Sequence, residues 1–223
     1  VCVKVASSSI CGSDLHLLDG GIAEGMILGH EFCGIAPDGT PVAVEPMAGC
    51  GSCWACDEGH LSFCSNGAIF YGIGLPGGMA DEIIVHPDAL VALPSGLALE
   101  HACLVEPLAV ATHALDRARV TDTDRVLVIG AGPIGLAAAA MLRHRGIPTT
   151  VSARHPHQQA AAERLGASLD VGDGYDVVID AVATSASIGE AVRRARPMGS
   201  GWSARHGSRP SSASPPALSL IHI

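Results

Sequence analysis

The sequence contains very little lysine and few aromatic residues. Among its 223 residues, Lys4 is the only lysine, 13 Lys and Arg stand against 22 Asp and Glu, and Phe, Trp and Tyr make up 3% of the chain. Proteins that bind nucleic acid usually carry a basic stripe and aromatic platforms for the bases. A net charge of -9 without such a stripe argues against a nucleic-acid partner.

Long uninterrupted hydrophobic runs are also absent. The longest apolar stretch, Val126 to Leu142, is broken by three glycines and a proline, so it lacks the continuous length of a membrane-spanning helix. No segment resembles a secretory signal peptide. We therefore expect no membrane partner and a cytoplasmic location, where disulfides are rare.

Four cysteines lie close together, at Cys50, Cys53, Cys56 and Cys64. Four thiols at this spacing can meet at one tetrahedral point, as a structural zinc ion requires. A redox dithiol would need only one C-x-x-C pair, and a disulfide would need an oxidising compartment. The spacing predicts a structural zinc ion. His60 is an alternative ligand, although Cys64 already completes a set of four thiolates.

Turns and apolar runs divide the chain into two parts and indicate an α/β fold. Residues 1–115 carry short β-type runs, such as 41–44 and 81–85, between Gly and Pro turns. A helical pattern over 97–118 crosses the end of this part, and Pro107 marks a kink or a helix start within it. Residues 116–199 alternate strand patterns (125–129, 149–151, 175–181) with helical patterns (130–146, 158–165). This alternation predicts a partial doubly wound parallel sheet.

A glycine-rich turn follows the apolar run 126–129 and opens an alanine-rich helix. Its residues are Gly130, Ala131, Gly132, Pro133, Ile134 and Gly135. In this strand–turn–helix context, the pattern G-x-G-x-x-G is a dinucleotide-binding fingerprint, whose glycines permit the tight turn, the approach of the pyrophosphate and close packing of the helix. The helix N-terminus offers free N–H groups to the phosphates.

The choice between NAD and NADP depends on the end of the second strand. NAD-binding versions of this unit carry an acidic residue there, which accepts hydrogen bonds from the ribose hydroxyls. Here the strand runs into Ala153 and Arg154, with no carboxylate. A small residue followed by a cation favours the 2'-phosphate of NADP, with NAD as the alternative, because Arg154 could also be a solvated loop cation.

Residues of the types that hold a catalytic zinc ion occur at Cys11, His30, Glu31 and Glu106. Catalytic zinc keeps three protein ligands and one open position. With the cysteine segment and the glycine fingerprint, these positions resemble the zinc-dependent medium-chain dehydrogenase/reductase superfamily, in its polyol and threonine dehydrogenase-like branch. The matching segments are 11–16 (CGSDLH), 29–31 (GHE), 50–64, 77–80 (GGMA), 106–111 (EPLAVA) and 130–135.

The resemblance implies a GroES-like β-rich catalytic domain and roles for individual residues. Cys11, His30 and either Glu31 or Glu106 would hold the catalytic zinc, with the other carboxylate close by. Ser13 would take the proton of the substrate hydroxyl, His16 would pass it toward solvent, and Asp14 would orient His30. The family's reaction passes through a zinc-bound alkoxide, from which hydride leaves to the nicotinamide.

The resemblance further implies two zinc ions per chain, a small alcohol or carbonyl substrate and, for the full-length protein, a homo-oligomer, either a dimer or a tetramer. The interval of nineteen residues from Cys11 to His30 is shorter than the family suggests. The identity of the substrate is therefore the inference that the resemblance supports least. A catalytically inactive zinc-binding fragment of such an enzyme is the alternative function.

The segment 200–223 matches neither part of the chain. The family would continue after Gly199 with an apolar strand, whereas the sequence turns to Ser, Pro and Arg. A shift of reading frame near Gly199 would restore that strand, and the last six residues match a translated sequencing adaptor. We therefore expect a truncated or frameshifted chain with a non-native tail. A natural disordered tail is the alternative.

Overall fold

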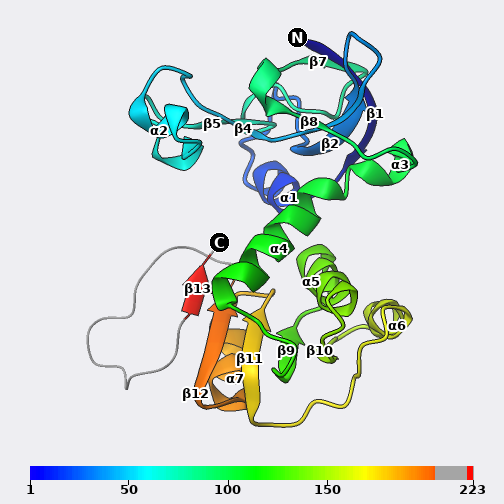
Figure 1. Ribbon diagram of the computed structural model, residues 1–223, viewed down its shortest axis with the longest axis vertical. Helices are drawn as coiled ribbons and strands as arrows, with labels where there is room; N and C mark the ends of the chain where they lie inside the picture. Colours follow the sequence, from blue (N-terminus) through cyan, green and yellow to red (C-terminus); the bar gives the residue numbers. More distant parts are fainter. Residues whose placement is uncertain (204–219, 223) are drawn as a thin grey trace. The chain divides into compact units, whose positions relative to one another are not determined.

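A computed structural model describes residues 1–203 and 220–222, and the chain divides into two compact units, Val1–Glu106 and Pro107–Ile223. Figure 1 shows a first unit rich in strands and a second built from helices around a parallel sheet. No helix among the described residues is long and apolar enough to cross a membrane. The predicted α/β class, with a β-rich domain followed by a partial Rossmann sheet, is confirmed.

The main sheet of the first unit has five antiparallel strands in the order β7-β1-β2-β3-β8. These strands are β1 (Cys2–Ser9), β2 (Glu31–Ile35), β3 (Pro41–Val44), β7 (Glu82–Ile84) and β8 (Leu90–Ala92). Val3, Phe32, Val42 and Ile83 lie in its core. Burying these side chains gives the sheet its main stabilisation, because apolar surface leaves water.

Shorter elements complete the first unit. A small sheet joins β4 (Met47–Ala48), β5 (Ile69–Tyr71) and β6 (Gly74–Leu75), and the segment between β4 and β5 forms the four-cysteine lobe, residues 50–64. The helices are α1 (Gly12–Asp19), α2 (Trp54–Asp57) and α3 (Leu99–Ala102), with single 3-10 turns η1 (Leu61–Phe63) and η2 (Pro87–Ala89). Figure 1 shows the lobe extending away from the main sheet of this unit.

The second unit is a parallel five-stranded sheet in the order β10-β9-β11-β12-β13. Its strands are β9 (Val126–Ile129), β10 (Thr149–Ser152), β11 (Tyr175–Asp180), β12 (Ala195–Ser203) and β13 (Leu220–His222), and its helices are α5 (Pro133–His144), α6 (Pro156–Arg164) and α7 (Ser185–Arg194). All four residues of β9 are buried, as expected for a strand that is covered on both faces.

Helix α4 (Val105–Ala118) runs from the end of the first unit into the second. The sequence predicts one helix over 97–118, but the structure contains α3 and α4, separated at Cys103 and Leu104. Pro107 lies in the first turn of α4, where its missing N–H costs no intrahelical hydrogen bond. The compact units meet at Glu106, and the predicted domain boundary at 115/116 stays a prediction.

The predicted tail falls partly outside the described residues, which omit 204–219 and 223. Its first residues, Ser200–Ser203, continue β12 and pair with β11 in parallel, and Leu220–His222 form β13 beside β12. Backbone pairing carries no information on the reading frame. The frameshift near Gly199 and the non-native or disordered tail therefore stay predictions.

Candidate metal and dinucleotide sites

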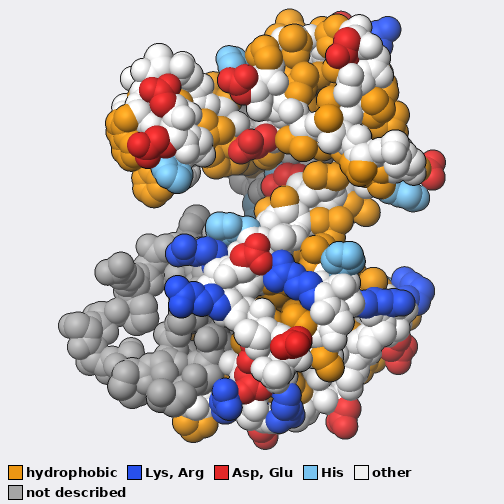
Figure 2. All heavy atoms as spheres, in the orientation of Figure 1, with side chains coloured by type: hydrophobic (Ala, Val, Ile, Leu, Met, Phe, Trp, Pro, Cys, Tyr) orange, Lys and Arg blue, Asp and Glu red, His pale blue; other side chains and the backbone are white. Residues whose placement is uncertain are grey.

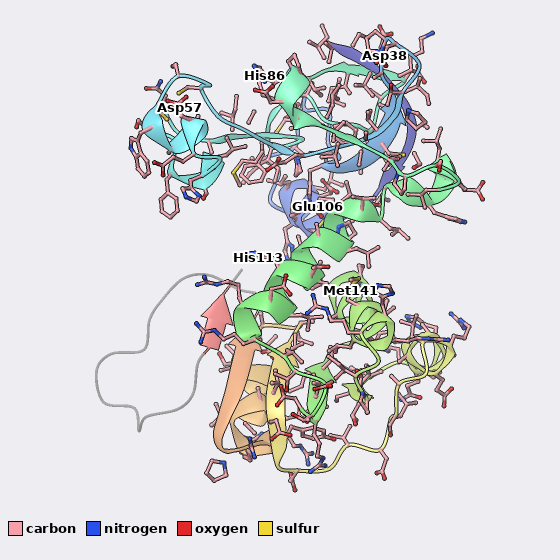
Figure 3. The ribbon with its side chains drawn as sticks, in the orientation of Figure 1. Asp38, Asp57, His86, Glu106, His113 and Met141 are labelled. Carbon is pink, nitrogen blue, oxygen red and sulfur yellow. The ribbon has the colours of Figure 1, made fainter. Side chains whose placement is uncertain are left out.

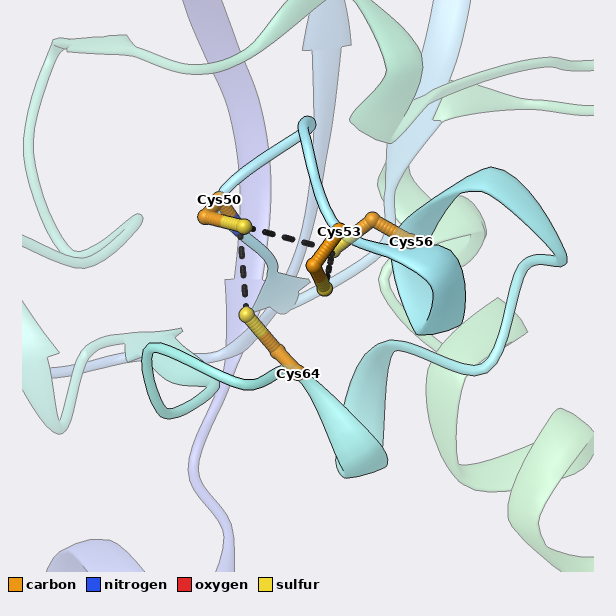
Figure 4. A group of neighbouring side chains, drawn as sticks. All are labelled: Cys50, Cys53, Cys56 and Cys64. Atoms are coloured by element: carbon orange, nitrogen blue, oxygen red, sulfur yellow. Dashed lines mark hydrogen bonds between the residues drawn. The ribbon is translucent and has the colours of Figure 1, made fainter.

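The four-cysteine lobe brings its sulfur atoms together (Figure 4). The Sγ atoms of Cys50, Cys53, Cys56 and Cys64 all lie within 4.8 Å of one another, with 3.5 Å between Cys53 and Cys56 and 4.0 Å between Cys50 and Cys56. A tetrahedral ion with Zn–S bonds of about 2.3 Å holds its sulfur ligands about 3.8 Å apart. The lobe therefore fits a zinc ion without rearrangement of its backbone.

Local hydrogen bonds prepare these thiols to bind a cation. Backbone hydrogen bonds from Ser65 and Cys56 lower the pKa of Cys53 to about 6. A backbone hydrogen bond from Gly51 lowers the pKa of Cys56, but desolvation and the neighbouring thiols outweigh it and raise that pKa to about 11. Zinc binds cysteine as the thiolate, so a metal ion would displace the protons that remain on these thiols. His60 is absent from this group of ligand atoms.

A second group of ligand atoms comes from Cys11, His30 and Glu31, again within 4.8 Å of one another. Strand pairing explains their meeting, because β1 and β2 run antiparallel with Ser9 opposite Glu31. The residues that follow β1 and those that open β2 are thus neighbours. His30 and Glu31 are buried, at 8% and 3% exposure, and burial raises the pKa of Cys11. A thiol, an imidazole and a carboxylate form a donor set suited to zinc.

Close packing of glycines holds the backbone at His30. Gly29 has φ +96°, and a Cβ there would lie 2.7 Å from the side chain and 2.9 Å from the backbone of Met79. A Cβ on Gly77 would lie 2.4 Å from the carbonyl oxygens of Leu28 and Gly29. The GGMA segment therefore packs directly against the ligand-bearing turn and leaves no space for larger residues.

Asp14 connects the first turn of α1 to His30. Its Oδ2 accepts a hydrogen bond of 2.8 Å from the backbone N–H of Cys11, and its Oδ1 lies 3.6 Å from His30 Nδ1. Asp14 is 1% exposed, and neither Oδ1 nor Nδ1 has a hydrogen-bond partner among the described residues. A carboxylate facing one imidazole nitrogen leaves the other nitrogen as the metal ligand.

Glu106 lies on the first turn of α4 (Figure 3). Burial and the charge of Glu31 raise its pKa to about 7, against a smaller lowering by His30. Its carboxylate is not among the ligand atoms that lie within 4.8 Å of one another. From the sequence, either Glu31 or Glu106 could be the third ligand of the catalytic zinc ion. The arrangement of the side chains favours Glu31.

Ser13 and His16 both belong to α1 but lie in different surroundings. Ser13 Oγ is half-buried and lies 3.4 Å from His30 Nε2, whereas His16 is exposed and its Nδ1 lies 2.7 Å from the carbonyl oxygen of Gly12. The described side chains include no direct hydrogen bond between Ser13 and His16. The structure therefore places Ser13 at the metal-ligand group and His16 at the surface.

Ser9 is a contact that sequence reasoning missed. Its Oγ donates to Glu31 Oε2 at 2.5 Å and so fixes the orientation of that carboxylate. This contact could have been predicted only from the pairing of β1 with β2, which the sequence did not reveal. Among the cysteines outside both groups, Cys33 and Cys103 are buried, whereas Cys2 is exposed.

The predicted dinucleotide turn lies between β9 and α5. Gly130 has φ +95°, and a Cβ on Gly135 would lie 1.9 Å from the carbonyl oxygen of Gly130, so only glycine permits this contact. Around Gly132, the N-cap of α5, a Cβ would meet nothing within 4 Å. Pro133 occupies the first position of the helix and Ile134 the second. The turn is thus closed on the protein side and open where a pyrophosphate would approach.

Ala153 and Arg154 follow β10, next to this turn. Ser152 pairs with Ile129 in the parallel register of β10 and β9, and its carbonyl oxygen accepts a hydrogen bond of 2.8 Å from the backbone N–H of Gly130. The carboxyl ends of the two strands are therefore level. Ala153 is half-buried and Arg154 is exposed. This edge is where the fold recognises the adenosine ribose.

Family models match segments in both parts of the chain. The model of the alcohol dehydrogenase GroES-like domain matches residues 1–95. A model of an FAD binding domain matches residues 123–164, a range that contains β9, α5, β10 and α6, the unit with the glycine-rich turn. Since NAD and FAD proteins share this phosphate-binding motif, the second match supports a dinucleotide site without choosing the cofactor.

Two curated relatives are polyol-type enzymes by name. D-xylulose reductase A of Aspergillus oryzae is 30% identical over 89% of the chain and 66% of its own length. A sorbitol dehydrogenase of Arabidopsis thaliana is 34% identical over 74% of the chain and 50% of its own length. The chain thus spans from half to about two thirds of the length of these relatives.

Solved structures show the same fold. An alcohol dehydrogenase from Escherichia coli CFT073 in complex with NADH superposes with a TM-score of 0.84 at 27% identity. The match covers 100% of the chain and 75% of that protein's chain. A Sinorhizobium meliloti 1021 protein named as a zinc-binding dehydrogenase, bound to NADP, superposes with a TM-score of 0.80 at 29% identity. The match covers 91% of the chain and 68% of that protein's chain.

A GroES-like domain with two groups of zinc-type ligands, followed by a dinucleotide-binding sheet, defines a class of oxidoreductases. The chain belongs to the zinc-dependent medium-chain dehydrogenase/reductase superfamily. The xylulose reductase and the sorbitol dehydrogenase act, by their names, on polyols and sugars, in line with the resemblance of the segment that begins at Glu106 to the polyol branch.

Proposed function

We propose that the chain is the metal- and nucleotide-binding part of a zinc-dependent oxidoreductase, which transfers hydride between an alcohol or polyol and NAD(P). The observation that carries this proposal is the convergence of Cys11, His30 and Glu31 within 4.8 Å, with buried Asp14 facing His30. The names of the polyol-type relatives support the substrate class.

Cys11, His30 and Glu31 would hold the catalytic zinc ion, and Glu106 would stand beside it as a second carboxylate. When bound, zinc supplies a positive charge that lowers the pKa of an alcohol oxygen. Asp14 would hold a proton on the nitrogen of His30 that it faces at 3.6 Å, and Ser9 orients Glu31 by its hydrogen bond. Residues behind the ligands would thus contribute to the geometry of the site.

Ser13 is suited to accept the hydroxyl proton of the substrate, because its half-buried Oγ lies 3.4 Å from a metal ligand, His30. His16 would exchange the proton with solvent. Its Nδ1 is 2.7 Å from a carbonyl oxygen and so carries the hydrogen, which leaves Nε2 as the nitrogen that accepts a proton. A water molecule would have to connect the two side chains.

The glycine-rich turn, through Gly130, Gly132, Pro133, Ile134 and Gly135, would hold the pyrophosphate, and NAD(P) would accept the hydride. Ala153 and Arg154 favour NADP over NAD. The proposal also includes a second, structural zinc ion at the four-cysteine lobe, a cytoplasmic location and, for the whole protein, a homo-oligomer. A nucleic-acid or membrane partner is not part of the proposal.

Metal analysis tests the ligand assignment. The chain should contain two zinc ions, and His30→Ala should contain one and lose turnover by about a thousandfold or more, since the ion's charge is the main stabilisation of the reacting oxygen. His101→Ala is the matched control, because His101 is exposed in the same unit and outside both ligand groups. Two zinc ions in His30→Ala would refute the site.

The third ligand is tested by comparing Glu31→Gln with Glu106→Gln. If Glu31 is the ligand, Glu31→Gln should lose the catalytic zinc, whereas Glu106→Gln should keep both ions. The reverse result would assign the metal to Glu106.

The alternative to this proposal is a zinc-binding fragment of such an enzyme without turnover. Oxidation of a panel of secondary alcohols and polyols, with NAD and NADP compared side by side, distinguishes the two. Turnover would exclude the fragment, and two bound zinc ions without turnover would support it.

A further inference from the structure

The arginines and carboxylates are distributed very unevenly around the dinucleotide turn. From Arg125 to Ala162 the chain contains no Asp or Glu, a run of 38 residues in a protein with 22 carboxylates. An even distribution would place about four carboxylates there. The run covers β9, α5, β10 and most of α6, which is the whole unit that would surround the phosphates. Its only charged side chains are arginines and any protonated histidines.

Arg154 is available to an external anion. Arg145, Arg194 and Arg196 of the same unit are engaged with Asp116, Asp173 and Asp176 at 2.7 to 2.8 Å. Within the described part of the chain, no carboxylate forms such a pair with Arg154, which is exposed immediately after β10. Since an unpaired guanidinium can bind a phosphate bidentately, the position favours an anionic ligand group.

Two histidines follow Arg154 closely in the sequence. His155 and His157 are exposed, and their rings are stacked, with centroids 5.6 Å apart and planes inclined by 6°. The amide of Gln159 donates to the carbonyl oxygen of Ala153 at 3.0 Å, which ties the loop to α6 and fixes the start of this segment. Each neutral imidazole adds one N–H donor to those of Arg154, and a protonated imidazole adds two.

We propose that His155 and His157 act together with Arg154 to recognise the 2'-phosphate of NADP, and so contribute to the choice between NADP and NAD. This inference rests on the proposed function, because it assumes a nicotinamide dinucleotide at the glycine-rich turn. Level carboxyl ends of β9 and β10 place the three residues beside that turn, where the ribose hydroxyl that carries the extra phosphate is recognised. The imidazoles are specificity residues and take no part in hydride transfer.

Equilibrium binding to the full chain tests the inference, with NADPH and NADH fluorescence as readouts. The double variant His155→Asn/His157→Gln keeps a good N-cap on α6 and removes both imidazoles. We expect its Kd for NADPH to rise about tenfold, as for loss of hydrogen bonds to a charged group, and its Kd for NADH to change less than about twofold. His144→Gln, exposed at the opposite end of α5, is the matched control.

A second probe avoids the nicotinamide altogether. Adenosine 2',5'-bisphosphate should compete with NADPH in the unmodified chain and lose about tenfold in affinity in the double variant, whereas 5'-AMP should be unaffected. Equal changes for NADPH and NADH, or none, would overturn the inference. If the chain binds neither dinucleotide, the proposed function itself fails. If it binds NADH and the variants alter neither Kd, only the histidine assignment fails.

Should the double variant not fold, the single variants His155→Asn and His157→Gln provide the same comparison. The ratio of the two Kd values within one preparation is independent of the folded fraction. Single variants in which that ratio stays unchanged would equally overturn the inference.

Discussion

The two units of this chain carry opposite charge. Residues 1–106 hold thirteen carboxylates against one lysine, a formal net charge of -12, whereas residues 107–223 hold all twelve arginines against nine carboxylates, a net of +3. Figure 2 shows arginine side chains, in blue, over the second unit on the visible face. The overall value of -9 therefore conceals one unit suited to cations and another suited to anions.

The ligand chemistry of each unit follows the same division. The first unit gathers thiols, imidazole and carboxylates into two groups that fit zinc. The second offers backbone N–H groups, Arg154 and two histidines beside a turn that fits a pyrophosphate. Charge composition by unit thus indicates which kind of ligand each would bind, although the chain as a whole does not. Substitutions in either unit, and added salt, can test this division.

The largest effect is expected from Cys56→Ser. Removing one thiolate opens the four-cysteine lobe, where a structural zinc ion contributes about 10 kcal/mol or more to folding in small domains. Zinc content should fall from two ions to one, and the amides of residues 50–64 should lose hydrogen-exchange protection while the second unit keeps it. Cys2→Ser is the control, because Cys2 is an exposed cysteine outside both groups. Unchanged zinc content would contradict the lobe as a metal site.

An intermediate effect is expected from Asp14→Asn. The amide can still accept the hydrogen bond from the Cys11 N–H, but it no longer presents a negative charge to His30. Affinity for the catalytic zinc should fall by about 10- to 100-fold, measured by competition with a chelator, while the lobe zinc is retained. Equal affinity in both proteins would show that Asp14 serves only to cap α1.

The smallest effect concerns salt. Raising the ionic strength from about 0.05 to 0.5 M should weaken NADPH binding by about threefold or more, because exposed cations are screened beyond a few ångströms. NADH, without the 2'-phosphate, should respond less, and Arg154→Ala should reduce the difference between the two. Zinc content should not change with salt. Identical salt dependence for both dinucleotides would argue against a 2'-phosphate contact at Arg154.

Local patterns were predictable because the residues that act together are adjacent in sequence. Cys50 to Cys64 form one short loop, and Gly130 to Gly135 form one turn, so spacing alone indicated their chemistry. The strands at 41–44 and 175–180 were likewise read from short apolar runs. The break between α3 and α4 was missed, since the helical spacing of apolar residues continues across Cys103.

Contacts between distant segments needed the strand pairing. The preference for Glu31 over Glu106 follows from Glu31 lying opposite Ser9 at the start of β2, and the contact of Ser9 with Glu31 has no local signal. The exposure of Cys2 depends on its position in β1, where it lies beside Glu82 rather than in the core. Sequence spacing cannot supply these facts, because each depends on the register between two strands.

The sequence by itself determined the fold class, the four-cysteine lobe, the dinucleotide turn and the residue types at Cys11, His30, Glu31 and Glu106, since each is a short pattern with a direct chemical meaning. Only the tertiary structure brought Cys11 to His30, turned Asp14 toward that histidine, and stacked His155 on His157 beside the end of β10. The reason is geometric: ligands and charges act over a few ångströms, and only the paired strands and packed helices set those distances.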